Sequence, residues 1–228
     1  MSRRESGARG TGAAPPLADG RIETASTPSR LVANLAAGRP QHLVTYGCSL
    51  TAGGAWVEQV GQALDARYPG LLRVTNSGQG AMWSRWGLEN LDERVVALRP
   101  DSVLVEFSMN DAYLPYDTSL AEARRNLEGM IDRLAAALPA CEVVVMVMNP
   151  PTGEHLAIRP RIEEYNQVYR QVAAERGLRL IDHWPAWQRL LREAPETFRL
   201  YVPDGIHPAP IGCQQIISPR VLAGLGAA

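Results

Sequence analysis

The chain has 228 residues, 46% of them hydrophobic and 21% charged, which is typical of one globular domain of ordinary size. Its formal net charge of −1 gives no basic field for nucleic acid, so we expect no nucleic-acid partner. All 23 basic residues are arginine, and the absence of lysine excludes Schiff-base chemistry, a P-loop lysine and a Ser-Lys dyad.

Residues 1–26 are poor in hydrophobic side chains and rich in Gly, Ala, Ser and Pro, so we expect a flexible tail followed by a single domain over residues 27–228. The tail has no apolar stretch of the kind found in secretory signals, and no run of about 18 apolar residues follows it. The three cysteines are too widely spaced for a disulfide framework or a zinc motif. These features predict a cytoplasmic protein with reduced thiols and no membrane partner.

From Thr27 onward the hydrophobic pattern alternates between helices and strands. Thr27-Pro28 predicts a helix start with Thr27 as the N-cap, and this first helix ends at Gly38. Strands are predicted over residues 42–46, 71–75, 102–107, 141–148 and 178–181. Further helices are predicted over residues 55–68, 86–98, 120–138 and 162–176, within 184–198, and over 208–225. Five strands alternating with helices predict an α/β fold with a parallel sheet covered on both faces.

Ser49 lies in the sequence Tyr-Gly-Cys-Ser-Leu-Thr, where the first strand turns into a helix. Its hydroxyl is therefore at the carboxyl end of a strand, the edge at which open α/β sheets bind ligands. Amides at the start of the following helix can stabilise negative charge nearby. Small residues are also common at such turns for backbone reasons alone, so the motif makes Ser49 a candidate nucleophile that needs support from elsewhere.

Two polar loops supply this support. Residues 76–81 follow the second strand, and Asn110 and Asp111 follow the third. In a sheet of order 2-1-3-4-5 both loops flank the first strand. Backbone amides of the glycine-rich loop and the side-chain amide of Asn110 are suitable donors to an oxyanion, whereas an ordinary turn and an Asx turn or helix cap are the alternatives.

Asp204 and His207 are three positions apart on a turn held by prolines and a glycine near the end of the chain. This spacing allows the carboxylate to orient the imidazole and to stabilise its protonated form. The alternative is a capped turn with a surface histidine. His155 and His183 follow the fourth and fifth strands and are rival bases.

Cofactor motifs are absent: no Gly-x-Gly-x-x-Gly follows the first strand, and neither His-Glu-x-x-His nor a carboxylate cluster occurs. We therefore expect no metal and no organic cofactor. Trp83 and Tyr113 lie in loops near the same sheet edge and are candidates for lining a substrate pocket.

The motifs around Ser49, residues 76–81, Asn110 and Asp204-x-x-His207 occur in the order found in the SGNH (GDSL-type) hydrolase family, which the chain resembles over about residues 40–215. The resemblance implies a flavodoxin-like three-layer α/β/α sandwich, with a five-stranded parallel sheet of order 2-1-3-4-5, and a serine esterase without a cofactor. It also implies roles for individual residues. Ser49 is the nucleophile, His207 the general base and Asp204 its orienting partner, while Asn110 and the amides of Ser49 and Ala81 (or Gly80) form the oxyanion hole.

Three positions depart from the family pattern: Cys48 replaces the usual aspartate, Ser108 a glycine, and Ala81 the second-block glycine unless the loop shifts by one residue to Gly80. We expect a serine esterase that hydrolyses an O-acyl ester of a small soluble substrate through an acyl-enzyme on Ser49. An acyltransferase or thioesterase using the same acyl-enzyme is the first alternative. A catalytically silent binding domain, suggested by the three replacements, is the second.

Overall fold

The computed structural model describes residues 27–227, and the predicted flexible tail over residues 1–26 lies outside them. Five strands form one parallel sheet in the order β2-β1-β3-β4-β5, which confirms the predicted order. The strands are β1 (Gln41–Gly47), β2 (Leu72–Asn76), β3 (Ser102–Glu106), β4 (Glu142–Val147) and β5 (Arg179–Asp182).

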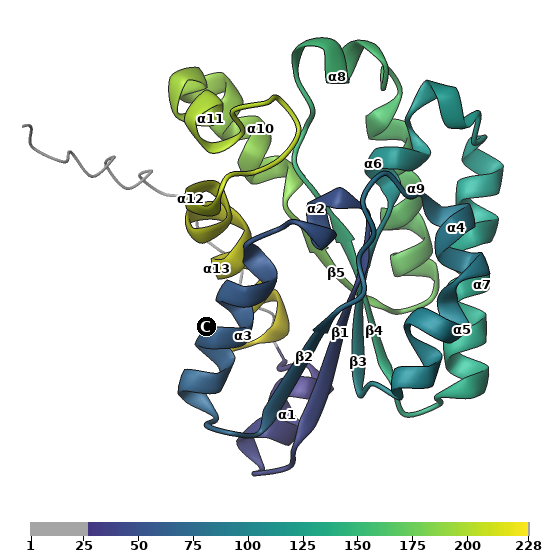
Figure 1. The fold of residues 1–228 in the computed structure, drawn as a ribbon, viewed down its shortest axis with the longest axis vertical. Coiled ribbons are helices and arrows are strands. Elements are labelled where there is room, and N and C mark those ends of the chain that lie inside the picture. Colours follow the sequence, from purple (N-terminus) through teal and green to yellow (C-terminus); the bar gives the residue numbers. More distant parts are fainter. Residues whose placement is uncertain (1–26, 228) are drawn as a thin grey trace, which may run out of the picture.

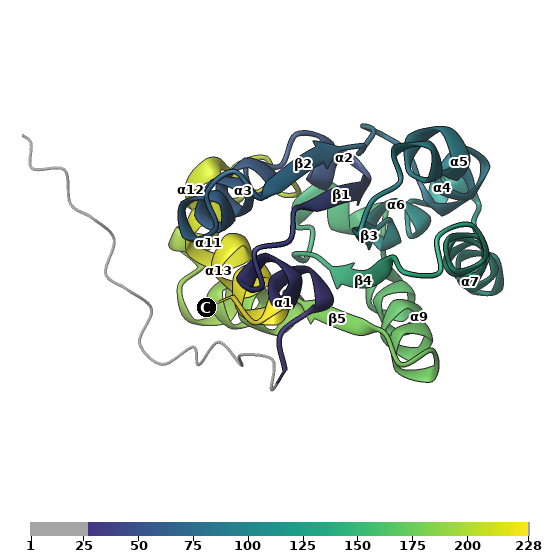
Figure 2. The ribbon, with the colours of Figure 1, turned by 90° about the horizontal axis from the view of Figure 1, so that it is seen from below.

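Helices cover both faces of this sheet and so form the three-layer α/β/α sandwich that was expected (Figure 1). Figure 2 shows α1, α3 and α13 on one face and α4, α7 and α9 on the other. The α-helices are α1 (Arg30–Ala36), α2 (Ser49–Ala52), α3 (Trp56–Arg67), α4 (Ser84–Glu89), α5 (Leu91–Arg94), α6 (Ser108–Asp111), α7 (Leu120–Ala137), α8 (Gly153–Ala157), α9 (Ile162–Glu175), α10 (Trp184–Glu193), α11 (Pro195–Tyr201), α12 (Pro210–Gly212) and α13 (Ser218–Leu225). Two 3₁₀ helices, η1 (Val96–Leu98) and η2 (Leu114–Tyr116), and one π-helix, η3 (Cys213–Ile217), complete the described chain.

The core lies between the sheet and its two helical layers. Every residue of β1 and β3 is buried, and so is all of β4 after its first residue, because central parallel strands are covered on both faces. The edge strand β2 is only partly buried. Helix α7 contributes Leu127, Met130 and Leu134 to the core at spacings of three and four residues, which places them on one face of the helix. No helix within residues 27–227 is both long and apolar enough to cross a bilayer, and the cytoplasmic location stays a prediction.

The predicted start of the first helix was wrong by two residues. Ser29, not Thr27, is the N-cap, and its hydroxyl accepts a hydrogen bond from the N–H of Val32 at 3.1 Å. The apolar side chains that follow are buried as expected.

The predicted single helix over residues 86–98 was also wrong, since the chain forms α4, α5 and η1 there instead. Asn90 ends α4 with φ −104° and ψ 7°, and its side-chain amide donates to the carbonyl of Trp86 at 2.9 Å. An asparagine that bonds the preceding turn in this way competes with the backbone and interrupts a helix. The predicted final helix over residues 208–225 begins at Pro210 instead, and the π-helix η3 separates its two parts, α12 and α13.

Three short helices follow the carboxyl ends of central strands: α2 and α6 begin two residues after β1 and β3 end, and α8 follows β4 after the loop over residues 148–152 (Figure 1). They were not predicted, because four or five residues are too few to show a helical period. All three therefore follow the carboxyl edge of the sheet, and the first of them begins with the candidate nucleophile, Ser49.

Candidate active site

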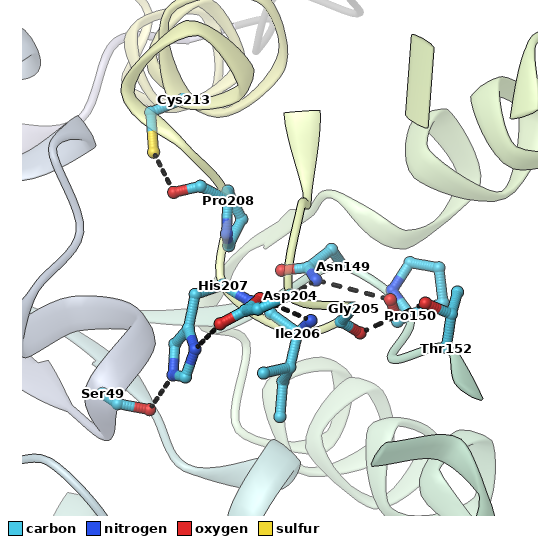
Figure 3. A network of polar contacts seen from close by, with 10 residues as sticks. All are labelled: Ser49, Asn149, Pro150, Thr152, Asp204, Gly205, Ile206, His207, Pro208 and Cys213. Carbon is cyan, nitrogen blue, oxygen red and sulfur yellow. Dashed lines mark hydrogen bonds and ion pairs between the residues drawn. The ribbon is translucent and has the colours of Figure 1, made fainter. Parts of the chain in front are cut away.

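Ser49, His207 and Asp204 form a chain of hydrogen bonds at the carboxyl edge of the sheet (Figure 3). Ser49 is the first residue of α2, and its Oγ is 2.9 Å from Nε2 of His207. Nδ1 of His207 is 2.7 Å from Oδ2 of Asp204. A carboxylate can only accept at this contact, so Nδ1 carries the proton and Nε2 is left to accept the Ser49 hydroxyl.

The loop between α11 and α12 supplies the histidine and the aspartate and is held in shape by the aspartate itself. Oδ1 of Asp204 accepts hydrogen bonds from the N–H groups of Ile206 at 3.0 Å and of His207 at 2.7 Å. Burial acts to raise the pKa of Asp204, but these two bonds and the contact with the ring outweigh it and lower the pKa to about 2. Asp204 is therefore ionised at neutral pH, where its carboxylate can orient the imidazole of His207 and stabilise its protonated form.

Residues after β4 anchor this loop to the sheet (Figure 3). Asn149 is fully buried, and its side-chain amide donates to the carbonyl of Ile206 at 2.9 Å. The N–H of Thr152 donates to the carbonyl of Gly205 at 2.8 Å. Asn149 was not among the residues selected from the sequence, although it is a polar residue just after an apolar strand.

The turn that presents Ser49 is built over a buried carboxyl group. Oε1 of Glu106 accepts from the N–H of Cys48 at 3.0 Å and from the hydroxyl of Thr51 at 2.6 Å. Gly47 makes this approach feasible, because a Cβ there would lie 2.3 Å from Oε1 of Glu106. Burial raises the pKa of Glu106 to about 7. Glu106 was not among the residues selected from the sequence, although an acidic residue within an apolar strand could have indicated it.

Cys48, which stands where the family has an aspartate, is buried beneath the same turn. Its thiol donates to Oε2 of Glu106 at 3.3 Å. Burial and then the neighbouring carboxyl group raise its pKa well above the ordinary value, which leaves the thiol protonated and weakly nucleophilic.

Three N–H donors that follow the carboxyl ends of β1, β2 and β3 are candidates for an oxyanion hole. Asn110 in α6 uses one of its two Nδ2–H groups on the carbonyl of Met82, at 3.0 Å. The backbone N–H groups of Ser49 and Ala81 find no acceptor among residues 27–227. Ala81 has φ +59°, in the left-handed region that favours glycine, whereas Gly80 has no positive φ.

Replacing Ala81 with glycine is expected to stabilise the fold by about 0.5–1 kcal/mol, because relief of the left-handed strain exceeds the added entropy of the unfolded chain. Chemical denaturation measures this change, and kcat should stay within about twofold of the wild-type value. The matched control is Gly80→Ala, because a Cβ at position 80 has no neighbour within 4 Å. Gly80→Ala is expected to leave stability unchanged or to raise it slightly. A destabilising Ala81→Gly would contradict the strain assigned to position 81.

Asp111 is buried next to Asn110 in α6. Its Oδ1 accepts from the N–H of Ser84 at the start of α4, and its Oδ2 accepts from the hydroxyl of Tyr169, both at 2.9 Å. Burial raises the pKa of Asp111 to about 6. Ser108, which replaces the family glycine, donates to Oδ1 of Asn166 at 2.8 Å. These contacts attach α6, which carries Asn110, to α4 and α9.

The predicted pocket residues Trp83 and Tyr113 lie beside the loop that carries Ala81. Trp83 stacks on Tyr116 with 4.3 Å between ring centroids, and Tyr113 meets Tyr116 edge-on at 4.9 Å. The hydroxyl of Tyr116 donates to the carbonyl of Ala81. The aromatic residues and the candidate hole are therefore parts of one connected surface.

The rival histidines do not contact Ser49. His183 is fully buried, neither ring nitrogen has a partner within residues 27–227, and burial lowers its pKa to about 3. His155 lies in α8, and its Nδ1 has no hydrogen-bond partner within residues 27–227. Within the described part of the chain, no three His, Cys, Asp or Glu side chains form a group that could hold a metal ion.

Comparison with known proteins places this geometry among relatives. The model of the GDSL-like lipase/acylhydrolase family matches residues 44–215. An acetylxylan esterase of Geobacillus stearothermophilus is 24% identical over 182 residues, which are 76% of this chain and 81% of that protein. Among solved structures, Axe2, an acetylxylan esterase from the same organism, has a TM-score of 0.71 and 23% identity, covering 83% of this chain and 95% of Axe2. LAE5, an alpha/beta hydrolase from the metagenome of Lake Arreo in Spain, has a TM-score of 0.71 and 25% identity, covering 83% of this chain and 96% of its own.

Proposed function

The chain belongs to the GDSL-like lipase/acylhydrolase family and is a serine hydrolase that acts on ester bonds, and from this premise we propose that Ser49, His207 and Asp204 carry out the hydrolysis. The hydrogen bonds that link these three side chains at 2.9 and 2.7 Å are the observation that carries the proposal. Catalytic mutants of Axe2 have been solved with a serine, an aspartate or a histidine replaced, and that aspartate and histidine are three positions apart, as Asp204 and His207 are. Membership of a hydrolase family speaks against the alternative of a silent binding domain.

In the proposed reaction, Oγ of Ser49 attacks the ester carbonyl carbon while Nε2 of His207 takes the hydroxyl proton. The bond to the alcohol oxygen then breaks, and His207 gives its proton to that oxygen. Water then attacks the acyl carbon while Nε2 of His207 takes one of its protons. The bond from the acyl carbon to Oγ of Ser49 breaks as His207 gives that proton to Oγ, which releases the carboxylic acid and restores the serine hydroxyl. Asp204 stays ionised throughout and stabilises the imidazolium in both steps.

The negative charge on the carbonyl oxygen is stabilised by the N–H groups of Ser49 and Ala81 and by the free Nδ2–H of Asn110. These donors are held by α2, the 76–81 loop and α6 before the substrate arrives, so little reorganisation accompanies the reaction. Each such donor contributes about 10² to 10³ in rate in enzymes of this kind.

We propose a small O-acetylated carbohydrate as the substrate class. The acetylxylan esterase relative supports a short acyl group on a sugar. The stacked rings of Trp83 and Tyr116 support the sugar part, because an aromatic face next to the hole is a surface on which a sugar ring can pack.

This substrate assignment is tested by measuring acetate released from acetylated xylooligosaccharides and by comparing p-nitrophenyl acetate with p-nitrophenyl octanoate. We expect acetate release and a higher kcat/KM for the acetyl ester. Trp83→Ala should raise KM for the sugar ester by about 3- to 10-fold and leave p-nitrophenyl acetate nearly unaffected. A preference for octanoate, or no release from the sugar ester, would overturn the assignment, and an acylated product formed with added alcohols would favour the acyltransferase alternative.

A further inference from the structure

Arg159 is a buried arginine that contacts Asn110, one of the candidate donors of the oxyanion hole. It lies between α8 and α9 with only 6% of its surface exposed. Its Nε donates to the carbonyl of Met109 at 2.9 Å, and one terminal nitrogen donates to Oδ1 of Asn110 at 3.1 Å. The ring of Tyr113 covers the guanidinium, with 4.7 Å from the central carbon to the ring centroid.

The guanidinium has no carboxylate partner within residues 27–227, although buried arginines are usually paired with one. Burial lowers the pKa of Arg159 from its ordinary value, while an arginine still remains protonated at neutral pH. A buried cation without an anionic partner is costly, so its position calls for an explanation beyond packing.

Its contacts fix which way round the Asn110 amide lies. An arginine has only donors, so the atom that faces it must be the amide oxygen, and the carbonyl of Met82 has only acceptor capacity, so the atom that faces it must be the nitrogen. With one Nδ2–H committed to Met82, the second is left to donate to a substrate oxygen. Without Arg159, the amide loses the group that distinguishes its two ends.

We propose that Arg159 is a positioning residue of the esterase reaction, which holds the Asn110 amide so that its free N–H meets the oxyanion. This inference rests on the proposed role of Asn110 in the hole. The same bond polarises the amide and strengthens that N–H as a donor.

A double-mutant cycle between Arg159 and Asn110 tests the proposal. Arg159→Met should lower kcat for p-nitrophenyl acetate by about 10²-fold and change KM by less than about threefold, because a donor used only in the transition state is misplaced. In an Asn110→Ala background, where no amide remains to be positioned, the same substitution should lower kcat by less than about threefold. The matched control is Arg161→Met, an exposed arginine paired with Glu164, which should leave kcat unchanged.

Thermal denaturation separates this role from one in folding alone. If Arg159→Met does not fold, Arg159→Lys serves in the same cycle, because its single ammonium group cannot reproduce the fork that spans Met109 and Asn110. Equal losses of kcat in both backgrounds, or a wild-type kcat in folded Arg159→Met, would overturn the proposal. An active Ser49→Ala measured alongside would instead overturn the proposed function, so the two failures are distinguishable.

Discussion

Ser49→Ala is expected to lower kcat for a short p-nitrophenyl ester by a factor on the order of 10⁶ and to leave the free energy of unfolding nearly unchanged. Without Oγ no acyl-enzyme can form, and only the weak acceleration by the remaining hydrogen-bond donors persists. Stability should be maintained because Ser49 is partly exposed and alanine is well tolerated at the start of a helix.

Ser119→Ala is the matched control, because it removes a serine hydroxyl that stabilises a helix and takes no part in the proposed reaction. Ser119 caps α7 by accepting the N–H of Glu122 at 3.1 Å, so its loss should lower the free energy of unfolding by about 1 kcal/mol without changing kcat. Steady-state kinetics and urea denaturation of both variants provide the comparison. If Ser49→Ala turned over within about tenfold of the wild-type rate, Ser49 could not be the nucleophile.

The arrangement of the sheet was predictable because strong, regular signals in the sequence determine it. Val143 to Val147 form an apolar run too short for a helix, and such runs alternate with amphipathic segments such as α7, which together require parallel strands with crossover connections. Once the sheet order is known, Ser49 and Asn110 must lie at the same edge, because both follow the carboxyl ends of adjacent strands.

Contacts that depend on side-chain placement or on a single backbone angle were not predictable. Arg159 lies in a segment without periodicity, and nothing in the sequence around it indicates that its guanidinium reaches Asn110, which is 49 positions away. The positive φ of Ala81 was not predictable either, because the left-handed region favours glycine and a glycine stands next to it at position 80. Glu106 gave a clearer signal, but its partners on the nucleophile turn become apparent only when β1 and β3 are paired.

The aspartate of the triad yields the second large prediction: Asp204→Asn is expected to lower kcat by about 10⁴-fold with little change in KM. Two backbone N–H groups, those of Ile206 and His207, require an acceptor at the position of Oδ1, so the oxygen of the new amide stays there. Its NH₂ group then faces Nδ1 of His207 and can only donate. The ring must therefore carry its proton on Nε2, where it cannot accept the proton of Ser49.

Kinetics over a range of pH test this prediction. Because the pKa of Asp204 is about 2, its carboxylate is ionised at every pH above about 4, and protonation of Asp204 cannot cause an acidic limb of the wild-type profile there. The loss in Asp204→Asn should accordingly persist across the whole range above pH 4. Asp182→Asn is the matched control, because this aspartate pairs with Arg170 away from the triad and should leave kcat unchanged. A folded Asp204→Asn with kcat within about tenfold of the wild type would mean that another contact sets the histidine tautomer, and the triad would reduce to a Ser49–His207 dyad.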